Sequence, residues 1–281
     1  MTTAVDLLAS YWTIAKGAQP HTDHEYSTAD FKDRVEAIAR AGFKGMGIWH
    51  ADLSHTMEKY SLAEMKKILD DNGIKHLELE FLTDWFLDGE RRARSNELRK
   101  MLLRAADVLK PRHIKVGDFF HEKCPMPKLI ESFAGLCHDA AEHGTRILFE
   151  LMPFAMIDTL EGALEMVSGA GARNGGIILD TWHVVKLGIP CEKLQQIPPQ
   201  YLLGVELNDG TIRNTGDMVE ETVNHRRLCG EGEFDVKGFI RAVQAAGYNG
   251  PWGIEVLNQE MRSWPLDKMV TEAYRTTSAQ F

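Results

Sequence analysis

The sequence lacks the features that would direct the chain to a membrane or to a nucleic acid. No apolar run approaches the roughly 18 residues that a membrane-spanning helix needs. The first residues show no basic stretch followed by an apolar one, as a secretion signal would. The net charge of −9 is unfavourable for binding a phosphate backbone. We therefore expect a cytoplasmic protein whose partner is a small molecule, with no nucleic acid and no membrane.

Other common signatures are also missing. The four cysteines form no C-x-x-C pair and show no regular spacing, so we expect free thiols in a reducing compartment. No G-x-G-x-x-G motif follows the first apolar segment, which argues against a dinucleotide-binding sheet. The sequence also has no glycine-rich phosphate cradle and no Pro/Ser-rich linker. These absences favour one domain, residues 1–281, and a substrate without a phosphate group.

Short apolar segments alternate with longer amphipathic segments along almost the whole chain. Thr28 and Gly42 bound the first predicted helix, and Ser61 with Glu64 forms a capping box at the start of the second. Strand followed by helix, repeated eight times, predicts an α/β protein with a closed (β/α)8 TIM barrel. A doubly wound open sheet is the alternative. The predicted strands are residues 11–15, 45–49, 76–82, 113–119, 146–152, 176–182, 202–208 and 252–257.

Acidic side chains stand at the ends of four consecutive predicted strands. Glu150 ends the fifth strand, Asp180 the sixth and Glu206 the seventh, and Glu255 lies near the end of the eighth. Because side chains alternate between strand faces, each acid shares a face with the residue two places earlier, which is glycine in the last two strands. The carboxyl ends of barrel strands form the rim that carries active sites. We therefore expect the four carboxylates to meet at that rim.

Such a cluster of acids predicts a metal site. Carboxylates on neighbouring strands, about 4.8 Å apart, would repel one another and could not all stay ionised in apolar surroundings. A divalent cation resolves the repulsion: oxygen ligands favour Mn²⁺ or Mg²⁺, and the imidazole of His183 widens the choice to Co²⁺ or Zn²⁺. We expect one divalent ion, with Mn²⁺ as the first choice. The alternative is that basic side chains neutralise one or two of the acids, namely Lys115, Arg146, Arg226 or Arg227.

Further side chains at the predicted rim are candidates for binding a substrate. His50 follows the second strand, Glu80 lies near the end of the third, and Lys115 lies in the fourth. Residues 211–227 read as a long loop-like stretch beside the site, which we expect to help cover the substrate. Aromatic side chains near the rim suit the face of a sugar ring or a larger aromatic group, although packing is the alternative for each of them. They are Trp49, Phe81, Trp85 and Phe86.

Four segments together resemble the sugar phosphate isomerase/epimerase family of xylose-isomerase-like barrels. They are "FELMPF", "LDTWH", "RRLCGEGEFD" and "GPWGIEV". That family includes ketose 3-epimerases, hydroxypyruvate isomerase and inosose dehydratase. The resemblance implies a metal-dependent isomerase or epimerase that removes a proton to give a metal-stabilised enediolate. Its substrate would be a non-phosphorylated sugar, ketose or keto-acid, and relatives of this kind lead us to expect a homodimer.

The resemblance also implies roles for individual residues. Glu150 and Glu255 match metal ligands that double as acid/base groups, Asp180 matches another metal ligand, and His183 matches a substrate contact. A substrate-binding arginine is expected at one of two adjacent positions, Arg226 or Arg227.

One position departs from the epimerase pattern. The seventh-strand ligand of those enzymes is typically His, whereas this chain has Glu206 in "GVELNDG". We still expect Glu206 to bind the metal, with His225 as the alternative ligand.

Three other functions are compatible with the sequence to different degrees. A dehydratase or lyase acting on a keto-sugar or an oxidised glycoside would begin with the same proton removal. An endonuclease of the abasic-site type shares this barrel, but its three-zinc cluster needs more histidines than residues 206–227 supply. A non-enzymatic metal-binding subunit is disfavoured because the acid pair Glu150 and Glu255 is complete.

Overall fold

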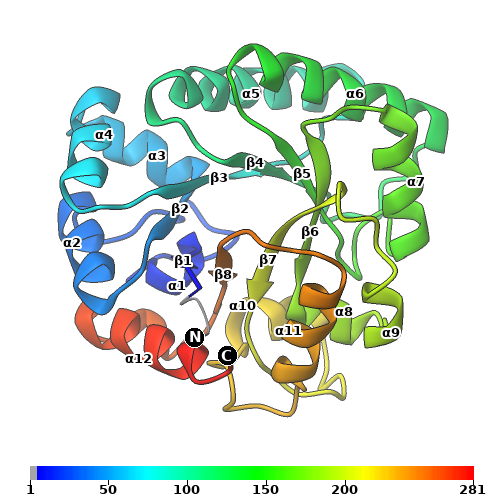
Figure 1. Ribbon diagram of the computed structural model, residues 1–281. Coiled ribbons are helices and arrows are strands. Elements are labelled where there is room, and N and C mark those ends of the chain that lie inside the picture. Colours follow the sequence, from blue (N-terminus) through cyan, green and yellow to red (C-terminus); the bar gives the residue numbers. More distant parts are fainter. Residues whose placement is uncertain (1–4) are drawn as a thin grey trace.

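The computed structural model, which describes residues 5–281, is a closed barrel of parallel strands. Each strand pairs with the next along the chain, and β8 pairs with β1 to close the circle (Figure 1). This topology confirms the predicted (β/α)8 TIM barrel. The strands are β1 (Leu7–Ala9), β2 (Gly45–Trp49), β3 (His76–Leu82), β4 (His113–Val116), β5 (Ile147–Glu150), β6 (Gly175–Asp180), β7 (Leu202–Leu207) and β8 (Trp252–Ile254).

Helices surround the barrel in a ring (Figure 1). Within residues 5–281, no helix is long and apolar enough to cross a membrane. The longer helices are α2 (Phe31–Ala41), α4 (Leu62–Asp71), α5 (Gly89–Leu109), α6 (Met126–Glu142), α7 (Leu160–Ala170), α11 (Val236–Ala245) and α12 (Leu266–Ser278). The shorter ones are α1 (Tyr11–Ile14), α3 (His50–Met57), α8 (Thr181–Lys186), α9 (Cys191–Leu194), α10 (Met218–Asn224) and the 3-10 turn η1 (Met261–Ser263).

Capping groups determine where the first helices begin and end. The hydroxyl of Ser61 accepts a hydrogen bond from the N–H of Glu64, and the Glu64 carboxylate accepts one from the N–H of Ser61, which confirms the capping box. Gly42 follows α2 in the left-handed conformation, with φ at 113°. The start of α2 differs from the prediction, because Asp30 rather than Thr28 caps it. The Asp30 carboxylate accepts the N–H two residues later at 2.9 Å.

The predicted first strand, residues 11–15, is wrong. The strand is Leu7–Ala9, and the aromatic and β-branched residues after it form the short helix α1. Strand propensity is a weak local preference that tertiary contacts override. Here the contacts come from β8 and the segment after it: the Thr13 hydroxyl donates to the carbonyl of Ile254 at 2.6 Å and accepts the N–H of Val256 at 2.9 Å.

Two glycines make room inside the barrel below the acids. A Cβ atom at Gly204 would lie 2.7 Å from Leu148 and 2.9 Å from Ile178, so larger residues would clash with these inward side chains. A Cβ atom at Gly253 would lie 2.8 Å from the Cγ of Glu206. Both positions therefore keep the space that the sequence pattern predicts.

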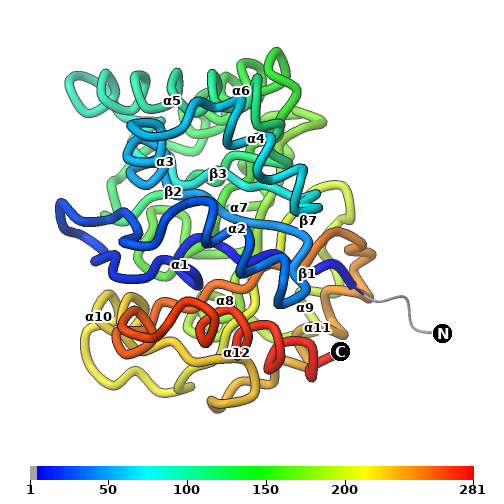
Figure 2. The backbone as a smooth tube through the Cα atoms, turned by 90° about the vertical axis from the view of Figure 1, so that its left-hand side faces the viewer, coloured from blue at the N-terminus to red at the C-terminus, as the bar shows by residue number. Residues whose placement is uncertain are grey.

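The segments that follow the strands build one end of the barrel. In Figure 2, α1, α3 and α10 (yellow) lie toward the same side of the molecule, away from the C-terminus. The cysteines of the described residues are free, as predicted, at positions Cys124, Cys137, Cys191 and Cys229.

Candidate functional site

A cavity of about 490 Å³ lies at the carboxyl ends of the strands. This is the end of a TIM barrel at which active sites occur, and the volume suits a small molecule. Its charged or ionisable lining includes Glu80, Lys115, Glu150, His183, Arg226 and Glu255. Its aromatic lining includes Trp12, Trp49, Phe81, Phe119, Phe120 and Phe154. The cavity thus combines a polar, charged region with apolar walls.

The four acids converge in the structure. One carboxylate oxygen from each of Glu150, Asp180, Glu206 and Glu255 lies within 4.8 Å of the others, and all four side chains are buried. Asp180 and Glu206 stand side by side in the β6–β7 pair. His225, the alternative to Glu206, is exposed and lies 3.5 Å from a surface glutamate. The structure therefore brings Glu206, rather than His225, into the cluster.

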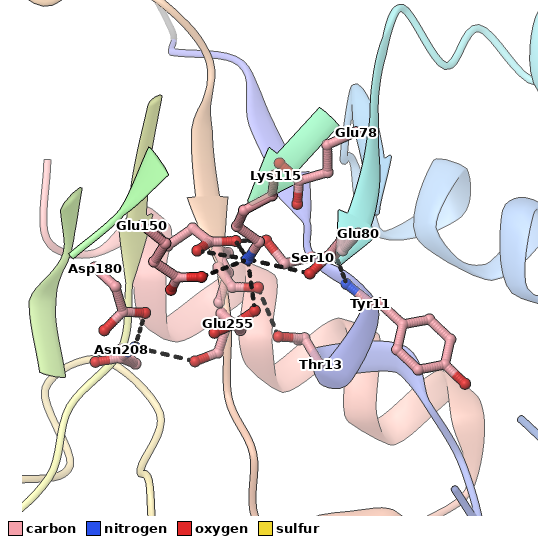
Figure 3. Close-up of polar contacts among 12 residues, drawn as sticks. Ser10, Tyr11, Thr13, Glu78, Glu80, Lys115, Glu150, Asp180, Asn208 and Glu255 are labelled. Atoms are coloured by element: carbon pink, nitrogen blue, oxygen red, sulfur yellow. Dashed lines mark hydrogen bonds and ion pairs between the residues drawn. The ribbon is translucent and has the colours of Figure 1, made fainter. Parts of the chain in front are cut away.

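The ammonium of Lys115 reaches across the barrel into this cluster (Figure 3). Its Nζ lies 2.9 Å from both oxygens of Glu206 and 2.9 Å from Oε1 of Glu255. It also lies 3.1 Å from Oε2 of Glu80 and 3.7 Å from Oε2 of Glu150. The Lys115 side chain is only 1% exposed. Lys115 therefore lies where the alternative prediction requires a basic side chain, namely among the acids that it would partly neutralise.

Arg226 is a second buried cation at the site. Its Nη1 donates to Oδ2 of Asp180 and to Oε2 of Glu255, each at 2.9 Å. Its Nε and Nη2 donate to the hydroxyl of Thr222 on α10, which fixes the plane of the guanidinium. Arg227, the neighbouring candidate, is exposed, and its Nη1 lies 3.4 Å from a backbone carbonyl of its own loop. Of the two arginines, Arg226 is the one that lines the cavity.

The segment "LDTWH" places both an acid and an imidazole at the site. Asp180 ends β6 and caps α8, since its Oδ1 accepts the N–H groups of Trp182 and His183 at 2.8 and 3.2 Å. The first turn of α8 brings His183 Nε2 to 3.4 Å from Oε1 of Glu150 and 3.3 Å from Nη2 of Arg226. The buried strand β6 ends on Asp180 because the Asp180 carboxylate caps α8. The first turn of α8 then directs His183 toward Glu150.

Burial and charged neighbours separate the pKa values of the acids. Burial raises the pKa of Glu80 to about 8, although the nearby ammonium of Lys115 opposes the shift. Burial also raises the pKa of Glu206 well above its ordinary value, and the adjacent Glu255 adds to the effect. Burial opposes ionisation of Glu255 as well, but Lys115 and Arg226 outweigh it and lower its pKa to about 2. At neutral pH the site therefore holds Glu80 as a protonated carboxyl and Glu255 as a carboxylate.

The predicted rim residues divide into two groups. His50, Trp49 and Phe81 line the cavity, and the Trp49 and Phe81 rings stack with centroids 6.0 Å apart. Burial lowers the pKa of His50, which favours its neutral form. Trp85 and Phe86 belong to the core instead, where the Trp85 ring packs against Phe86 and its N–H donates to a backbone carbonyl. For these last two aromatic residues, packing is the correct interpretation.

Sequence analysis misses several residues that contribute to the site, among them Phe119, Phe120 and Phe154 in the cavity lining. The Ser10 hydroxyl donates to Oε1 of Glu206 at 2.7 Å, and Trp12 lines the cavity. Ser10 directly follows β1 and Trp12 lies in α1, so the wrong prediction of the first strand failed to place either residue at the rim. The Asn208 amide donates to Oδ2 of Asp180 at 2.8 Å. Asn208 stands two residues after Glu206, so strand alternation could have placed both side chains on the same face.

Residues 211–227 are not one long loop, because α10 occupies their second half. The helix begins after Asp217, whose carboxylate accepts the N–H of Val219 at 2.7 Å. Val219, Thr222 and Val223 then line the cavity. The segment therefore forms part of a cavity wall, and its role in covering a substrate stays a prediction.

Residues 35–277 match the family described as the xylose isomerase-like TIM barrel. The chain belongs to the xylose isomerase-like TIM barrel family. This result confirms the resemblance carried by the four sequence segments, and the matched range contains all four acids of the cluster.

Two kinds of curated protein are similar to the chain. A 3-dehydroshikimate dehydratase of Pseudomonas aeruginosa is 27% identical over 250 residues, which cover 87% of this chain and 39% of that protein. An inosose isomerase of Bacillus velezensis is 22% identical over 261 residues, which cover 89% of this chain and 92% of that protein. The chain thus spans about two fifths of the length of the dehydratases that it matches.

Solved structures of xylose isomerase-like barrels show the same fold. An IOLI protein with a bound zinc atom matches with a TM-score of 0.85 and 18% identity, over 98% of this chain and 97% of the other. A D-allulose 3-epimerase from Methylomonas sp. in complex with D-allulose matches with a TM-score of 0.74 and 15% identity, over 99% and 98%. At these identities the likeness establishes the fold. The buried Glu/Asp/His cluster suggests a divalent metal site.

Proposed function

We propose that the protein removes a proton next to the carbonyl group of a small, non-phosphorylated hydroxyketone or keto-acid, and thereby acts as a sugar isomerase or epimerase. The observation that best supports this function is the pair Glu150 and Glu255. These acids come from different sides of the barrel, and both border the cavity. Two carboxyl groups that approach one substrate can remove a proton and return it. The cytoplasmic location and the homodimer stay predictions of the sequence.

Glu150 is the best candidate for the base. Its Oε1 is buried and has no hydrogen-bond partner among residues 5–281, so it can accept a proton without losing a bond. Glu255 is the second candidate, held as a carboxylate by Lys115. Glu80 borders the same cavity with a pKa of about 8 and therefore carries a proton at neutral pH. Glu80 is suited to deliver that proton to the neighbouring carbon or to a leaving hydroxyl.

Other side chains would bind and orient the substrate. The ammonium of Lys115 and the guanidinium of Arg226 supply donors for carbonyl, hydroxyl or carboxylate oxygens of the substrate. The imidazoles of His183 and His50 can each donate or accept a hydrogen bond. Trp49 and its aromatic neighbours provide apolar faces for a ring and exclude water from the reacting atoms.

The donor set fits a divalent cation, with Mn²⁺ as our first choice. Four carboxylates each bring one oxygen within 4.8 Å of the others, and Oε1 of Glu150 has no hydrogen-bond partner within the described chain. Carboxylate oxygens are ligands that Mn²⁺ and Mg²⁺ prefer. Glu150, Asp180, Glu206 and Glu255 would hold the ion. When bound, such an ion polarises a carbonyl oxygen and makes the neighbouring C–H more acidic.

A dehydratase is the second candidate function. The observation that favours it is the similarity to the 3-dehydroshikimate dehydratases, at 26% and 27% identity. Removal of the same proton, followed by loss of a hydroxyl group as water, would give an unsaturated product. The protonated carboxyl of Glu80 could supply the proton that the leaving hydroxyl needs.

Proton exchange in heavy water tests the proposal. The protein, with added Mn²⁺, is incubated with an inosose, 3-dehydroshikimate or D-allulose, and deuterium uptake is followed by NMR. We expect exchange with at least one class of compound, and a loss of about 10²- to 10⁴-fold in Glu150→Gln. Glu142→Gln, at the exposed end of α6, is the matched control. An isomer as product supports the isomerase, an unsaturated product supports the dehydratase, and no exchange with any compound contradicts the proposal.

A further inference from the structure

Two cations of the protein already contact all four acids of the proposed metal site. Lys115 contacts Glu206, Glu255 and Glu150, and Arg226 contacts Glu255 and Asp180. Both oxygens of Glu255 are engaged, one by each cation. The protein's own cations therefore partly neutralise the acid cluster.

Glu206 is the acid most completely bound to Lys115. Its Oε2 accepts one hydrogen bond from the ammonium, and its Oε1 accepts one from the ammonium and one from Ser10. Nζ thus sits on the bisector side of the carboxylate, 2.9 Å from each oxygen. A divalent ion held on this same side of the carboxylate would lie about 2.0–2.2 Å from its oxygens. The ion and the ammonium would therefore occupy overlapping positions.

Charge repulsion between the Lys115 ammonium and a divalent ion adds to their steric overlap. An ammonium and a divalent ion a few ångströms apart repel each other in a buried site, where water screens little of the interaction. Lys115 is anchored on β4 and is buried on all sides, so its ammonium must move away from Glu206 and Glu255 before the ion can bind there. Glu150, at 3.7 Å from Nζ, is held least closely.

We propose that Lys115 is an internal cation that competes with a divalent ion for Glu206 and Glu255. The inference rests on the proposed metal site and adds a property to it. Four carboxylates alone would bind the ion tightly, whereas this chain binds it only to the extent that Lys115 is displaced. Lys115 is then a determinant of metal affinity as well as a substrate-binding group.

Binding of Mn²⁺ to the full chain, freed of metals, tests the competition directly. Free Mn²⁺ is measured by electron paramagnetic resonance during titration of wild type, Lys115→Met, Glu206→Gln and the double variant. We expect removal of Lys115 to tighten Mn²⁺ binding by at least about tenfold, or about 1.4 kcal/mol. The effect should appear in both backgrounds, as Lys115→Met against wild type and as the double variant against Glu206→Gln.

Lys186→Met is the matched control for loss of a lysine. The Lys186 ammonium pairs with Glu221 and lies over the ring of Trp182, close to the site but outside the acid cluster. Its removal should leave Mn²⁺ affinity unchanged. The double variant keeps the test valid if Lys115→Met alone fails to fold, because it removes the ammonium together with one carboxylate.

Unchanged or weaker Mn²⁺ binding on removal of Lys115 would overturn the inference. Equal tightening in Lys186→Met would also overturn it, since a general charge effect would then explain the result. Absence of Mn²⁺ binding in all variants would refute both the competition and the metal site. Proton exchange by the wild type would still be measured separately, so failure of this inference is distinguishable from failure of the proposed function.

Discussion

The raised pKa of Glu80 predicts that this single residue makes the protein less stable as pH rises. The Glu80 side chain is completely buried: its Oε1 accepts the N–H of Tyr11 at 3.1 Å, and its Oε2 lies 3.1 Å from Lys115. Burial raises its pKa from 4.5 to about 8. Between these values the folded protein binds this proton and the unfolded chain does not, so stability must fall with increasing pH.

The size of the effect follows from the width of that interval. One titrating group changes the free energy of unfolding by at most about 1.4 kcal/mol per pH unit. From about pH 5.5 to about pH 7.5, we expect Glu80 to lower it by about 2–3 kcal/mol. Glu80→Gln keeps the shape of the side chain but carries no titrating proton, so the loss should be absent in the variant.

Urea unfolding at several pH values, followed by tryptophan fluorescence, measures this difference. The free energy of unfolding of Glu80→Gln is subtracted from that of the wild type at each pH. The difference removes the contributions of all other titrating groups, provided that their pKa values are unchanged. Glu90→Gln on α5 is the control, because that side chain is 86% exposed and should give a difference independent of pH. A wild-type protein that gains stability over Glu80→Gln with rising pH would refute the reasoning. It would show that Lys115, and not burial, determines the charge of Glu80.

Substitutions at three further positions test other parts of the structure. Gly253→Ala should lower the free energy of unfolding by about 1–3 kcal/mol, because its Cβ would press on Glu206; urea unfolding measures this loss. Ser61→Ala should cost about 1 kcal/mol by removing the capping box of α4, and Ser61→Thr should recover most of it in the same assay. Arg226→Met should cost about 3–5 kcal/mol, because the two acids that it bridges lose a partner. Added Mn²⁺ should restore part of the melting temperature of Arg226→Met, as an ion at the proposed site would neutralise the same acids.

The barrel could be predicted because its signals are local. The bounds of β2 and β3 agree with the predicted ranges, 45–49 and 76–82, since helix-capping signals and apolar runs delimit both strands. β1 could not be predicted in the same way. Leu7–Ala9 is short and has no β-branched residue, whereas the aromatic and β-branched residues that follow have the stronger strand propensity. Pairing with β2 and β8, which closes the barrel, determines where β1 lies.

Strand alternation made part of the candidate site predictable, namely the acids at the strand ends. Alternation alone puts Glu150, Asp180 and Glu206 on inward faces, and the parallel arrangement brings their strand ends together. It does not predict the partners of a long flexible side chain. Lys115 contacts acids 91 and 140 residues away in the chain, and these contacts depend on the cross-section of the closed barrel.

Two adjacent residues of the same type could also not be told apart from the sequence. The sequence could not choose between Arg226 and Arg227, because the choice depends on which way an irregular segment faces. In the structure the backbone of Arg227 pairs with Asp209, while the side chain of Arg226 turns inward to the hydroxyl of Thr222. The difference depends on α10, which carries Thr222, and the sequence alone predicts a loop in place of this helix.

The distances from the two buried cations indicate how the four acids divide their tasks. Glu206, Glu255 and Asp180 each accept hydrogen bonds at 2.9 Å from Lys115 or Arg226, so a cation that binds these acids competes with those two side chains. Glu150 lies 3.7 Å from the ammonium, and its Oε1, 3.4 Å from His183 Nε2, accepts no hydrogen bond among the described residues. A substrate that enters the cavity can therefore bind Glu150 without displacing a cation of the protein. In the proposed competition, engagement of Glu206 and Glu255 requires Lys115 to move, whereas Asp180 is held by Arg226.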